Sequence, residues 1–280
     1  MPRLTRRPPT AGKRGATLAE LLVALSLAGL LYALGAFALV TVERRQRDGS
    51  ASGAGRRAIR ETIAVLGEEL RGVDSISLRG DTAVDLLALV GTSVVCARTA
   101  DAIVLPPATA ESGLPFTSWR ADADVTDVVA LFDAATSRWW YAAADSVAEA
   151  PRNACRPTTG LASPRDSADR LRSARLALDR LIPLGVEVGA PARILRRGRY
   201  LLHRSADGSW GLGYRRCPGA AGCASAQPVT GPLAPPSENG LSFALSADGS
   251  LLNVAVRAPR RPSGGPGDSL RVAMGVGRAP

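Results

Sequence analysis

Few side chains in this 280-residue sequence are of the types that enzymes use for chemistry. The single histidine, His203, stands between Leu202 and Arg204 on an expected strand, where a structural role is the common one. The sequence offers no recognisable Ser-His-Asp setting and no phosphate-binding loop of the Gly-x-x-x-x-Gly-Lys type. It therefore predicts a protein without catalytic residues or a cofactor, which is not an enzyme.

The candidate ligand-binding side chains also have simpler interpretations. Asp122 and Asp124 could bind calcium, but no EF-hand pattern surrounds them, which favours a solvated loop. Trp139, Trp140 and Tyr141 form the main aromatic cluster, and core or cross-strand packing explains them better than a ligand platform does. We expect no metal site.

The four cysteines are an even number, which indicates disulfides in a protein segment outside the cytoplasm. Cys217 and Cys223 could close a small loop, which would leave Cys96 to pair with Cys155. Four cysteines allow three connectivities, so this pairing is a hypothesis. A zinc site with four cysteines fits less well, because such sites usually show two close pairs and only one is present.

Glu20 is unusual because it is an acid in an apolar segment. The 27 residues 16–42 are otherwise almost wholly apolar, and as a helix they would reach about 40 Å. That length exceeds the roughly 30 Å hydrocarbon core of a membrane and is too long for the apolar region of a secretory signal peptide. A carboxylate inside a membrane costs at least about 2.5–3.5 kcal/mol at the helix centre and usually has a partner. Alternatively, Glu20 lies close enough to the interface to stay hydrated.

Residues 13–22 resemble the type III signal of type IV pilins and type II secretion pseudopilins. They read Lys-Arg-Gly-Ala-Thr-Leu-Ala-Glu-Leu-Leu. The family pattern is a basic leader that ends in Gly, then Phe-Thr-Leu-x-Glu, then an apolar helix. Four positions match this pattern: Gly15, Thr17, Leu18 and Glu20. The one departure is Ala16, which replaces the usual Phe.

This resemblance implies processing and assembly. A prepilin peptidase would cleave between Gly15 and Ala16 and then N-methylate Ala16, while Thr17 and Leu18 belong to the assembly motif. In the family, the carboxylate that corresponds to Glu20 pairs with the terminal amine of a neighbouring subunit, and in an apolar setting such a pair sets the axial register. The implied partners are prepilin peptidase, other pilin or pseudopilin subunits and the inner membrane.

The distribution of positive charge predicts an orientation. Residues 1–15 carry five basic side chains and no acid, which favours a cytoplasmic N-terminus. Arg44, Arg45 and Arg47, just beyond the apolar run, oppose this bias. The expected localisation is a single-pass inner-membrane protein with a periplasmic C-terminal head, which joins an assembled pilus or pseudopilus.

A second helical segment is expected after the apolar run. Apolar residues recur there at spacings of three and four, which predicts an amphipathic helix that packs on the rest of the protein. The stripe consists of Ile59, Ile63, Leu66, Leu70 and Val73. Three glycines, Gly49, Gly53 and Gly55, indicate a flexible or broken joint between the two helical segments.

From residue 75 onward, the pattern favours short antiparallel strands. The expected strands are 75–78, 84–89, 93–97, 103–105, 125–132, 138–143, 193–203, 210–215, 241–245, 251–256 and 270–276. Asp207-Gly208 and Asp248-Gly249 each stand between two such strands and predict hairpin turns. Segments rich in Pro, Gly and Ser are expected to be loops, namely 106–124, 145–170, 217–240 and 258–268.

The formal net charge of +10 is unevenly distributed. Residues 81–150 hold three basic and ten acidic residues, net −7, whereas residues 151–216 hold fourteen basic and five acidic residues, net +9. Either neighbouring strands and loops neutralise each other, or opposite faces steer docking to partner subunits. Aromatic residues are sparse in the basic segment 193–216, so nucleic-acid binding is not expected.

These predictions describe an α+β protein with four regions. Residues 1–15 form a cleaved basic leader, and 16–48 form a transmembrane and assembly helix. Residues 49–73 form the amphipathic half of the helix, which packs on an antiparallel, β-rich periplasmic head at 74–280.

The resemblance implies a minor pilin or pseudopilin, a structural subunit that primes or caps a type IV pilus or a type II secretion pseudopilus. Residues 196–202, 227–228 and 239–243 loosely resemble W-type minor pilins and J-type pseudopilins. One alternative is a pilin-like protein of DNA uptake. The other is a single-pass periplasmic sensor or enzyme with an uncleaved anchor.

Overall fold

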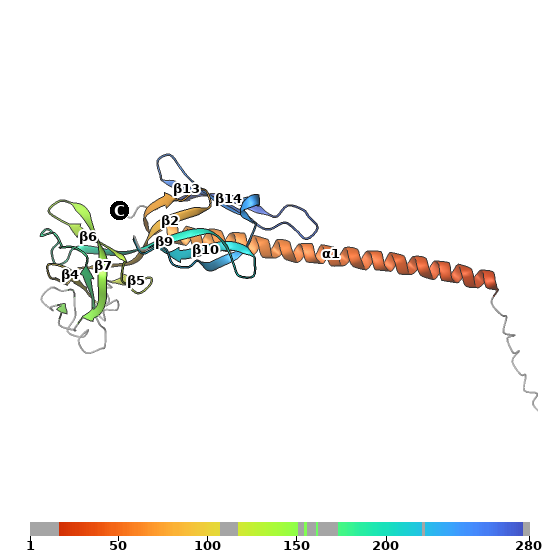
Figure 1. Ribbon diagram of the computed structural model, residues 1–280, viewed down its shortest axis with the longest axis horizontal. Coiled ribbons are helices and arrows are strands. Elements are labelled where there is room, and N and C mark those ends of the chain that lie inside the picture. Colours follow the sequence, from red (N-terminus) through yellow and green to blue (C-terminus); the bar gives the residue numbers. More distant parts are fainter. Residues whose placement is uncertain are drawn as a thin grey trace, which may run out of the picture. The chain divides into compact units, whose positions relative to one another are not determined.

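The computed structural model describes residues 17–106, 117–150, 154–155, 161, 173–219 and 222–276, and it has the α+β architecture that the sequence predicts. A long helix, α1 (Leu18–Leu70), precedes strands whose described pairings are all antiparallel (Figure 1). The chain divides into two units, one that ends at Ala51 and one that begins at Ser52.

The first unit contains the N-terminal part of α1. Leu and Ala dominate its sequence, and both residue types favour helix. No residue of α1 before Ser52 is buried within the described chain. This part of the helix therefore gains no stability from a core of its own.

The glycine cluster does not break α1. Gly49, Gly53 and Gly55 all lie within the helix, so the expectation of a broken joint is wrong. Gly55 has a packing role instead, because a Cβ atom there would lie 2.6 Å from the Cβ of Ala258. The missing side chain lets the helix approach Ala258 closely.

The second unit contains the last turns of α1 and two sheets. The larger sheet has 11 strands with the main order β1-β2-β9-β6-β7-β8-β4-β3, while β10 pairs with β9 and β11, and β5 pairs with β2. Its strands are β1 (Val73–Leu78), β2 (Ala83–Val94), β3 (Ala97–Arg98), β4 (Ala102–Leu105), β5 (Ser118–Trp119), β6 (Val128–Asp133), β7 (Arg138–Ala150), β8 (Ser173–Leu178), β9 (Pro191–Arg204), β10 (Trp210–Arg216) and β11 (Gln227–Leu233). A short 3-10 helix, η5 (Pro236–Glu238), leads to the smaller sheet of β12 (Leu241–Leu245), β13 (Leu251–Arg257) and β14 (Ser269–Gly275).

The first core lies where the last turns of α1 pack against both sheets. Ile59, Leu66 and Leu70 of the expected stripe are buried and Ile63 packs beside them, which confirms the amphipathic helix. The sheets contribute Val84, Leu86, Tyr200, Leu202, Leu212, Leu241, Phe243, Leu252, Val254, Val256 and Met274. Each buried Leu or Ile stabilises the fold by roughly 1.5–3 kcal/mol relative to an exposed one. This core therefore fixes the last turns of α1 to the head.

The second core belongs to the other end of the larger sheet. It contains Ile103, Leu105, Val129, Leu131, Leu176 and Ile194, among others. β9 reaches both cores, since Tyr200 lies in the first and Ile194 in the second. β2 does the same through Val84 in the first core and Val90 in the second. The pairing of β2 with β9, from Ala83–Leu201 to Val94–Pro191, thus connects the two cores.

The hairpin predictions at Asp-Gly are confirmed, because turns connect β9 to β10 and β12 to β13. Gly208 and Gly249 take the positive φ angles of 85° and 70° that these turns require. Other segments differ from the prediction. β2 continues through 90–92, β6 begins only at Val128, and β7 extends into the expected loop at 145–150.

Three strands lie where the sequence predicts loops or no element: β5, β8 and β11. β11 contains Pro228, Gly231 and Pro232, which give it the composition of a loop. Among the described strands it pairs only with β10, and proline is tolerated on such an edge strand because no further strand there needs its N–H group.

Candidate functional site

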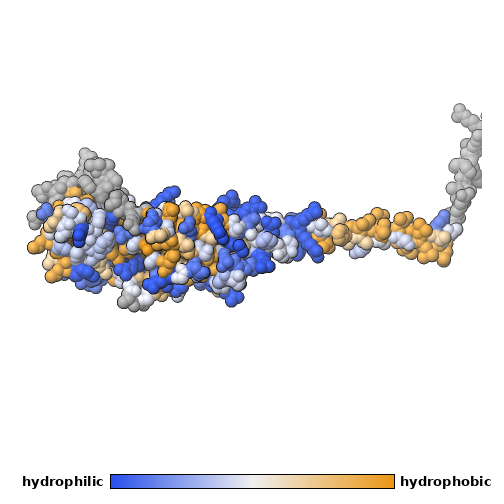
Figure 2. Space-filling view, turned by 90° about the horizontal axis from the view of Figure 1, so that it is seen from above, coloured by the Kyte–Doolittle hydropathy of each residue, from blue (hydrophilic) through white to orange (hydrophobic). Residues whose placement is uncertain are grey.

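The first half of α1 exposes apolar side chains on all sides. From Leu18 to Val42, its large apolar side chains are 46–81% exposed. Figure 2 shows this part of the helix as a nearly continuous orange surface. Its most apolar window has a mean hydropathy of 2.2, so within the described chain it is the one helix long and apolar enough to cross a membrane.

The helix begins with a capping box. The backbone N–H of Thr17 donates to Oε2 of Glu20 at 2.9 Å, and the N–H of Glu20 donates to the Thr17 hydroxyl at 3.3 Å. These reciprocal bonds satisfy two N–H groups that the first turn would leave without partners. Glu20 also places its negative charge at the positive end of the helix dipole.

This contact gives Glu20 a partner that sequence reasoning missed. The spacing Thr17-x-x-Glu20 is itself the sequence signature of a capping box, so the signal was present. A carboxylate has two oxygens and about four acceptor positions, so the cap leaves it able to accept further bonds. Leu18 is 80% exposed, and the expected processing positions Gly15 and Ala16 lie outside the described residues.

The four cysteines form two disulfides, Cys96–Cys155 and Cys217–Cys223. This is the pairing that the sequence favoured among the three possible ones. Cys96 and Cys155 are both buried, and their bond spans 59 positions of the chain. Since each of the four sulfur atoms takes part in one of these two bonds, none is left as a thiolate ligand for zinc.

A cluster of two acids and two arginines, which the sequence did not identify, joins β9 and β10 to the loop before β6. We call Asp124, Asp127, Arg196 and Arg216 the Asp127 cluster. Arg196 donates from Nε to Asp127 Oδ1 at 2.9 Å and from Nη2 to Oδ2 at 2.7 Å. Arg216 donates to Asp127 Oδ1 at 3.2 Å and also pairs with the Asp124 carboxylate.

The electrostatics of the Asp127 cluster are those of a structural contact. The Asp127 side chain is 1% exposed, and its charge is compensated by two guanidinium groups. The hydrogen bond from Arg216 holds the pKa of Asp124 below its ordinary value. The hydrogen bond to Asp127 raises the pKa of Arg196, which stays charged. Both shifts favour the charged forms of Asp124 and Arg196, as expected for a structural ion pair.

These pairs account for part of the charge segregation. Asp124 and Asp127 come from the acidic segment 81–150, whereas Arg196 and Arg216 come from the basic segment 151–216. Neutralisation within the chain is thus observed at this cluster. The sequence could not specify the pairs, because their members stand 69 to 92 positions apart.

The remaining candidate residues have structural surroundings. Trp139 packs edge-on against Phe132 at 5.7 Å, and the Arg193 guanidinium lies 4.1 Å from its ring centroid. Trp140 packs against the second core, and the Tyr141 hydroxyl donates to Asp74 at 3.4 Å. These contacts agree with the expected packing role of the aromatic cluster.

His203 and Asp122 do not join a reactive group either. His203 pairs across the strands with Gly211, and its Cβ atom lies over Gly213. Asp122 accepts a hydrogen bond from Arg196 through its backbone oxygen. Within the part of the chain that the structure describes, no group of three His, Cys, Asp or Glu side chains could hold a metal ion.

The two features that stand out are therefore the capped, exposed apolar helix and a head held by disulfides and ion pairs. The chain matches no protein-family model, no curated protein and no solved structure, so its function must be inferred from its own residues.

Proposed function

We propose that this protein is a minor pilin or pseudopilin, a non-enzymatic subunit that primes or caps a type IV pilus or a type II secretion pseudopilus. The observation that carries the proposal is the order of three features: a basic leader that ends in Gly15, the Thr-Leu-x-Glu segment, and a membrane-length apolar helix. The loosely similar segments in the C-terminal third favour the W-type minor pilins and J-type pseudopilins.

The apolar helix would lie first in the membrane and then among the helices of neighbouring subunits. Its exposed leucines require an apolar surrounding, because a large exposed apolar surface marks a membrane or protein contact. Lipid would supply this surrounding before assembly, and the helices of neighbouring subunits would supply it afterwards. The proposed orientation has a cytoplasmic leader and a periplasmic head, an oxidising location in which two disulfides persist.

Glu20 would then have two consecutive roles. Its bond to the Thr17 N–H stabilises the first turn of the helix within one subunit. After prepilin peptidase has cleaved before Ala16, the same carboxylate would pair with the new terminal amine of a neighbour. A charge left without a partner in an apolar setting is costly, so the pair would set the axial register of the subunits.

The N-terminal mass of the protein recovered from membranes tests the proposal. In a host with a prepilin peptidase, we expect a terminus at Ala16, and in a matched host without the enzyme we expect the uncleaved chain. A Gly15→Val variant should remain uncleaved, because a branched side chain prevents close approach of the backbone to the peptidase. An intact leader in the competent host would contradict the proposal and favour an uncleaved anchor.

Three variants separate the cap from the charge pair. Glu20→Gln keeps a side chain that can close a capping box but removes the charge. Thr17→Val removes the hydroxyl that accepts from the Glu20 N–H but keeps the charge. Glu20→Ala removes the charge together with the bond to the Thr17 N–H. We expect normal membrane insertion in all three, and impaired co-assembly with partner subunits in the two Glu20 variants.

Glu43→Gln is the matched control, since Glu43 is an acid on the same helix that pairs with Arg47 beyond the apolar run. Co-assembly can be measured by cross-linking in membranes. Normal assembly of Glu20→Gln together with failure of Thr17→Val would show that the cap matters and the charge pair does not.

A further inference from the structure

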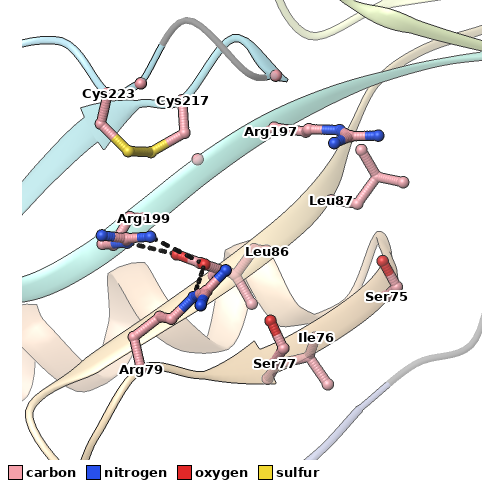
Figure 3. A pocket seen from close by; sticks show the side chains of 14 residues that line it. Ser75, Ile76, Ser77, Arg79, Leu86, Leu87, Arg197, Arg199, Cys217 and Cys223 are labelled. Atoms are coloured by element: carbon pink, nitrogen blue, oxygen red, sulfur yellow. Dashed lines mark hydrogen bonds and ion pairs between the residues drawn. A yellow bond between two sulfur atoms is a disulfide. The ribbon is translucent and has the colours of Figure 1, made fainter.

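A cavity of about 550 Å³ lies over β1, β2 and β9, beside the Cys217–Cys223 disulfide (Figure 3). Its charged lining residues alternate along the strands with residues of the first core. Along β9, Tyr200 is buried in that core, whereas Arg197 and Arg199 line the cavity. Asp85 lies opposite Arg199 in the strand register. The alternation of side chains on a strand thus gives this face a charged surface.

The charges on this face are not balanced. Asp85 accepts hydrogen bonds from Arg199 Nη2 at 3.0 Å and from Arg79 Nε at 2.9 Å, so one carboxylate serves two guanidinium groups. Figure 3 shows Arg79 and Arg199 converging on this carboxylate while Arg197 stands apart on the same face. Among the described residues, no side-chain hydrogen bond or ion pair of Arg197 is found.

Arg215 adds a fourth positive charge next to the cavity. It lies opposite Arg199 in the pairing of β9 with β10, and therefore on the same face of the sheet. Its Nε atom is buried and has no hydrogen-bond partner in the described part of the chain. We call Arg79, Arg197, Arg199 and Arg215 the outer-face arginines. With Asp85 as their one acidic neighbour in the cavity lining, this group carries a net charge of +3.

The disulfide gives the cavity a fixed wall. Cys217 and Cys223 both line it, and the N–H of Cys217 donates to the backbone oxygen of Arg197 at 3.0 Å. On the other side of the loop, the N–H of Ala224 donates to the backbone oxygen of Arg216 at 2.8 Å. Both ends of the loop are therefore bound to the strands that carry the arginines, so the wall is formed before any ligand arrives.

The chemistry of this face selects the class of ligand. A net positive charge disfavours a metal cation, and none of the residues that line the cavity is aromatic, so nothing there would stack on a nucleobase. A guanidinium group presents parallel N–H donors that match the oxygens of a carboxylate or a phosphate. We propose that this cavity binds an oxyanion, a carboxylate or phosphate group, with Arg197 as its principal donor.

Calorimetric titration of the full chain in a non-ionic detergent, at low ionic strength, tests this site with inorganic phosphate. We expect saturable binding that weakens about tenfold in Arg197→Gln, because the variant loses a hydrogen bond between two charged groups. Asp85→Asn should bind several-fold more tightly, since it removes the competing carboxylate. Circular dichroism establishes that each variant is folded.

Arg271→Gln is the matched control. Arg271 also lines a cavity on a sheet face, in the smaller sheet, but no second arginine lines that cavity. We expect its phosphate binding to equal that of the unaltered protein. Equal affinity in Arg197→Gln, or no phosphate or peptide binding by the unaltered protein, would overturn the proposal.

A second titration, with a blocked peptide of three glutamates, identifies the source of the oxyanion. Binding of phosphate alone assigns the cavity to a small free anion, whereas tighter binding of the peptide assigns it to an acidic segment of a partner. Both results support the site, provided that Arg197→Gln weakens the binding by about tenfold. The proposal does not depend on leader cleavage or assembly, so it can fail while the proposed function holds.

Discussion

Arg196 and Arg197 are neighbours in the sequence, but β9 turns them to opposite faces with different surroundings. On one face, the Asp127 cluster combines two arginines with two acids, and its central carboxylate is buried. On the other face, only Arg79 and Arg199 of the four outer-face arginines pair with Asp85 among the described residues. The positive and negative charges are thus equal in number in the Asp127 cluster, whereas the other face has more arginines than acids. The comparison teaches that a basic segment can combine structural and ligand-binding arginines at alternating positions.

The largest expected loss of stability comes from removing the central acid of the Asp127 cluster. Asp127→Asn removes the charge that Arg196 and Arg216 share, and breaking a buried ion pair costs about 3–5 kcal/mol. We expect a loss near the lower end, about 3 kcal/mol, because the two arginine side chains are 21% and 26% exposed. Urea denaturation of the oxidised protein measures the change in the free energy of unfolding.

Asp122→Asn is the control for this prediction. Asp122 is an exposed acid in the same loop, and its recorded bond to Arg196 uses the backbone oxygen rather than the carboxylate. We expect its stability to change by less than about 0.5 kcal/mol. A loss below 1 kcal/mol in Asp127→Asn would show that the two faces do not differ.

Acidic pH should weaken the ion pairs on both faces, and the loss of stability should be smaller than in Asp127→Asn. The pKa of Asp124 is lowered from 3.8 by its hydrogen bond to Arg216. Burial acts to raise the pKa of Asp85, but hydrogen bonds from Arg199 and Arg79 lower it overall from 3.8. Carboxyls with a lowered folded pKa stabilise the protein above their unfolded pKa, and this contribution is lost as the pH falls through the folded value.

We therefore expect the free energy of unfolding to decrease below about pH 4. Chemical denaturation at pH 6, 4 and 3 measures the slope, and Asp85→Asn and Asp124→Asn should each make it shallower. A slope that is unchanged in both variants would contradict the role of these pairs.

The smallest expected change in stability comes from replacing Arg197, one of the outer-face arginines. Arg197→Gln removes a charge that has no acidic partner among the described residues, so the free energy of unfolding should change by less than about 0.5 kcal/mol. Arg196→Gln, one position earlier, should cost about 2 kcal/mol, because it removes two hydrogen bonds between charged groups. Equal losses in the two variants, measured by urea denaturation, would remove the distinction between the faces.

Much of the fold was accessible from the sequence where local signals agree. The amphipathic stripe that contains Leu66 follows from the helical spacing of its apolar residues, and the turns at Gly208 and Gly249 follow from the preference of such turns for Asp-Gly. Gly55 was misread as part of a helix break because its role is tertiary: its close approach to Ala258 cannot be seen before the chain has folded. β11 was missed for a related reason, since its place at a sheet edge, rather than its composition, allows two prolines.

The residues of the candidate sites were harder to predict from the sequence than the fold was. The motif around Glu20 was visible, but its Thr17 partner was interpreted as part of the pilin-like signal and assembly motif, although the same spacing makes a capping box. Neutralisation between segments was one of two interpretations of the charge segregation, and it did not identify Asp127 as the centre of the pairs. Which arginines remain unbalanced depends on strand register and side-chain alternation, and neither can be counted from composition.

The pairing of β2 with β9 has a mechanical consequence. The two strands pair at eleven positions, and the two cores lie toward opposite ends of this ladder. A force that pulls the cores apart along the strands loads the hydrogen bonds together in shear, whereas a force across the strands would open them one after another. The head therefore resists extension best along the direction that joins its two cores.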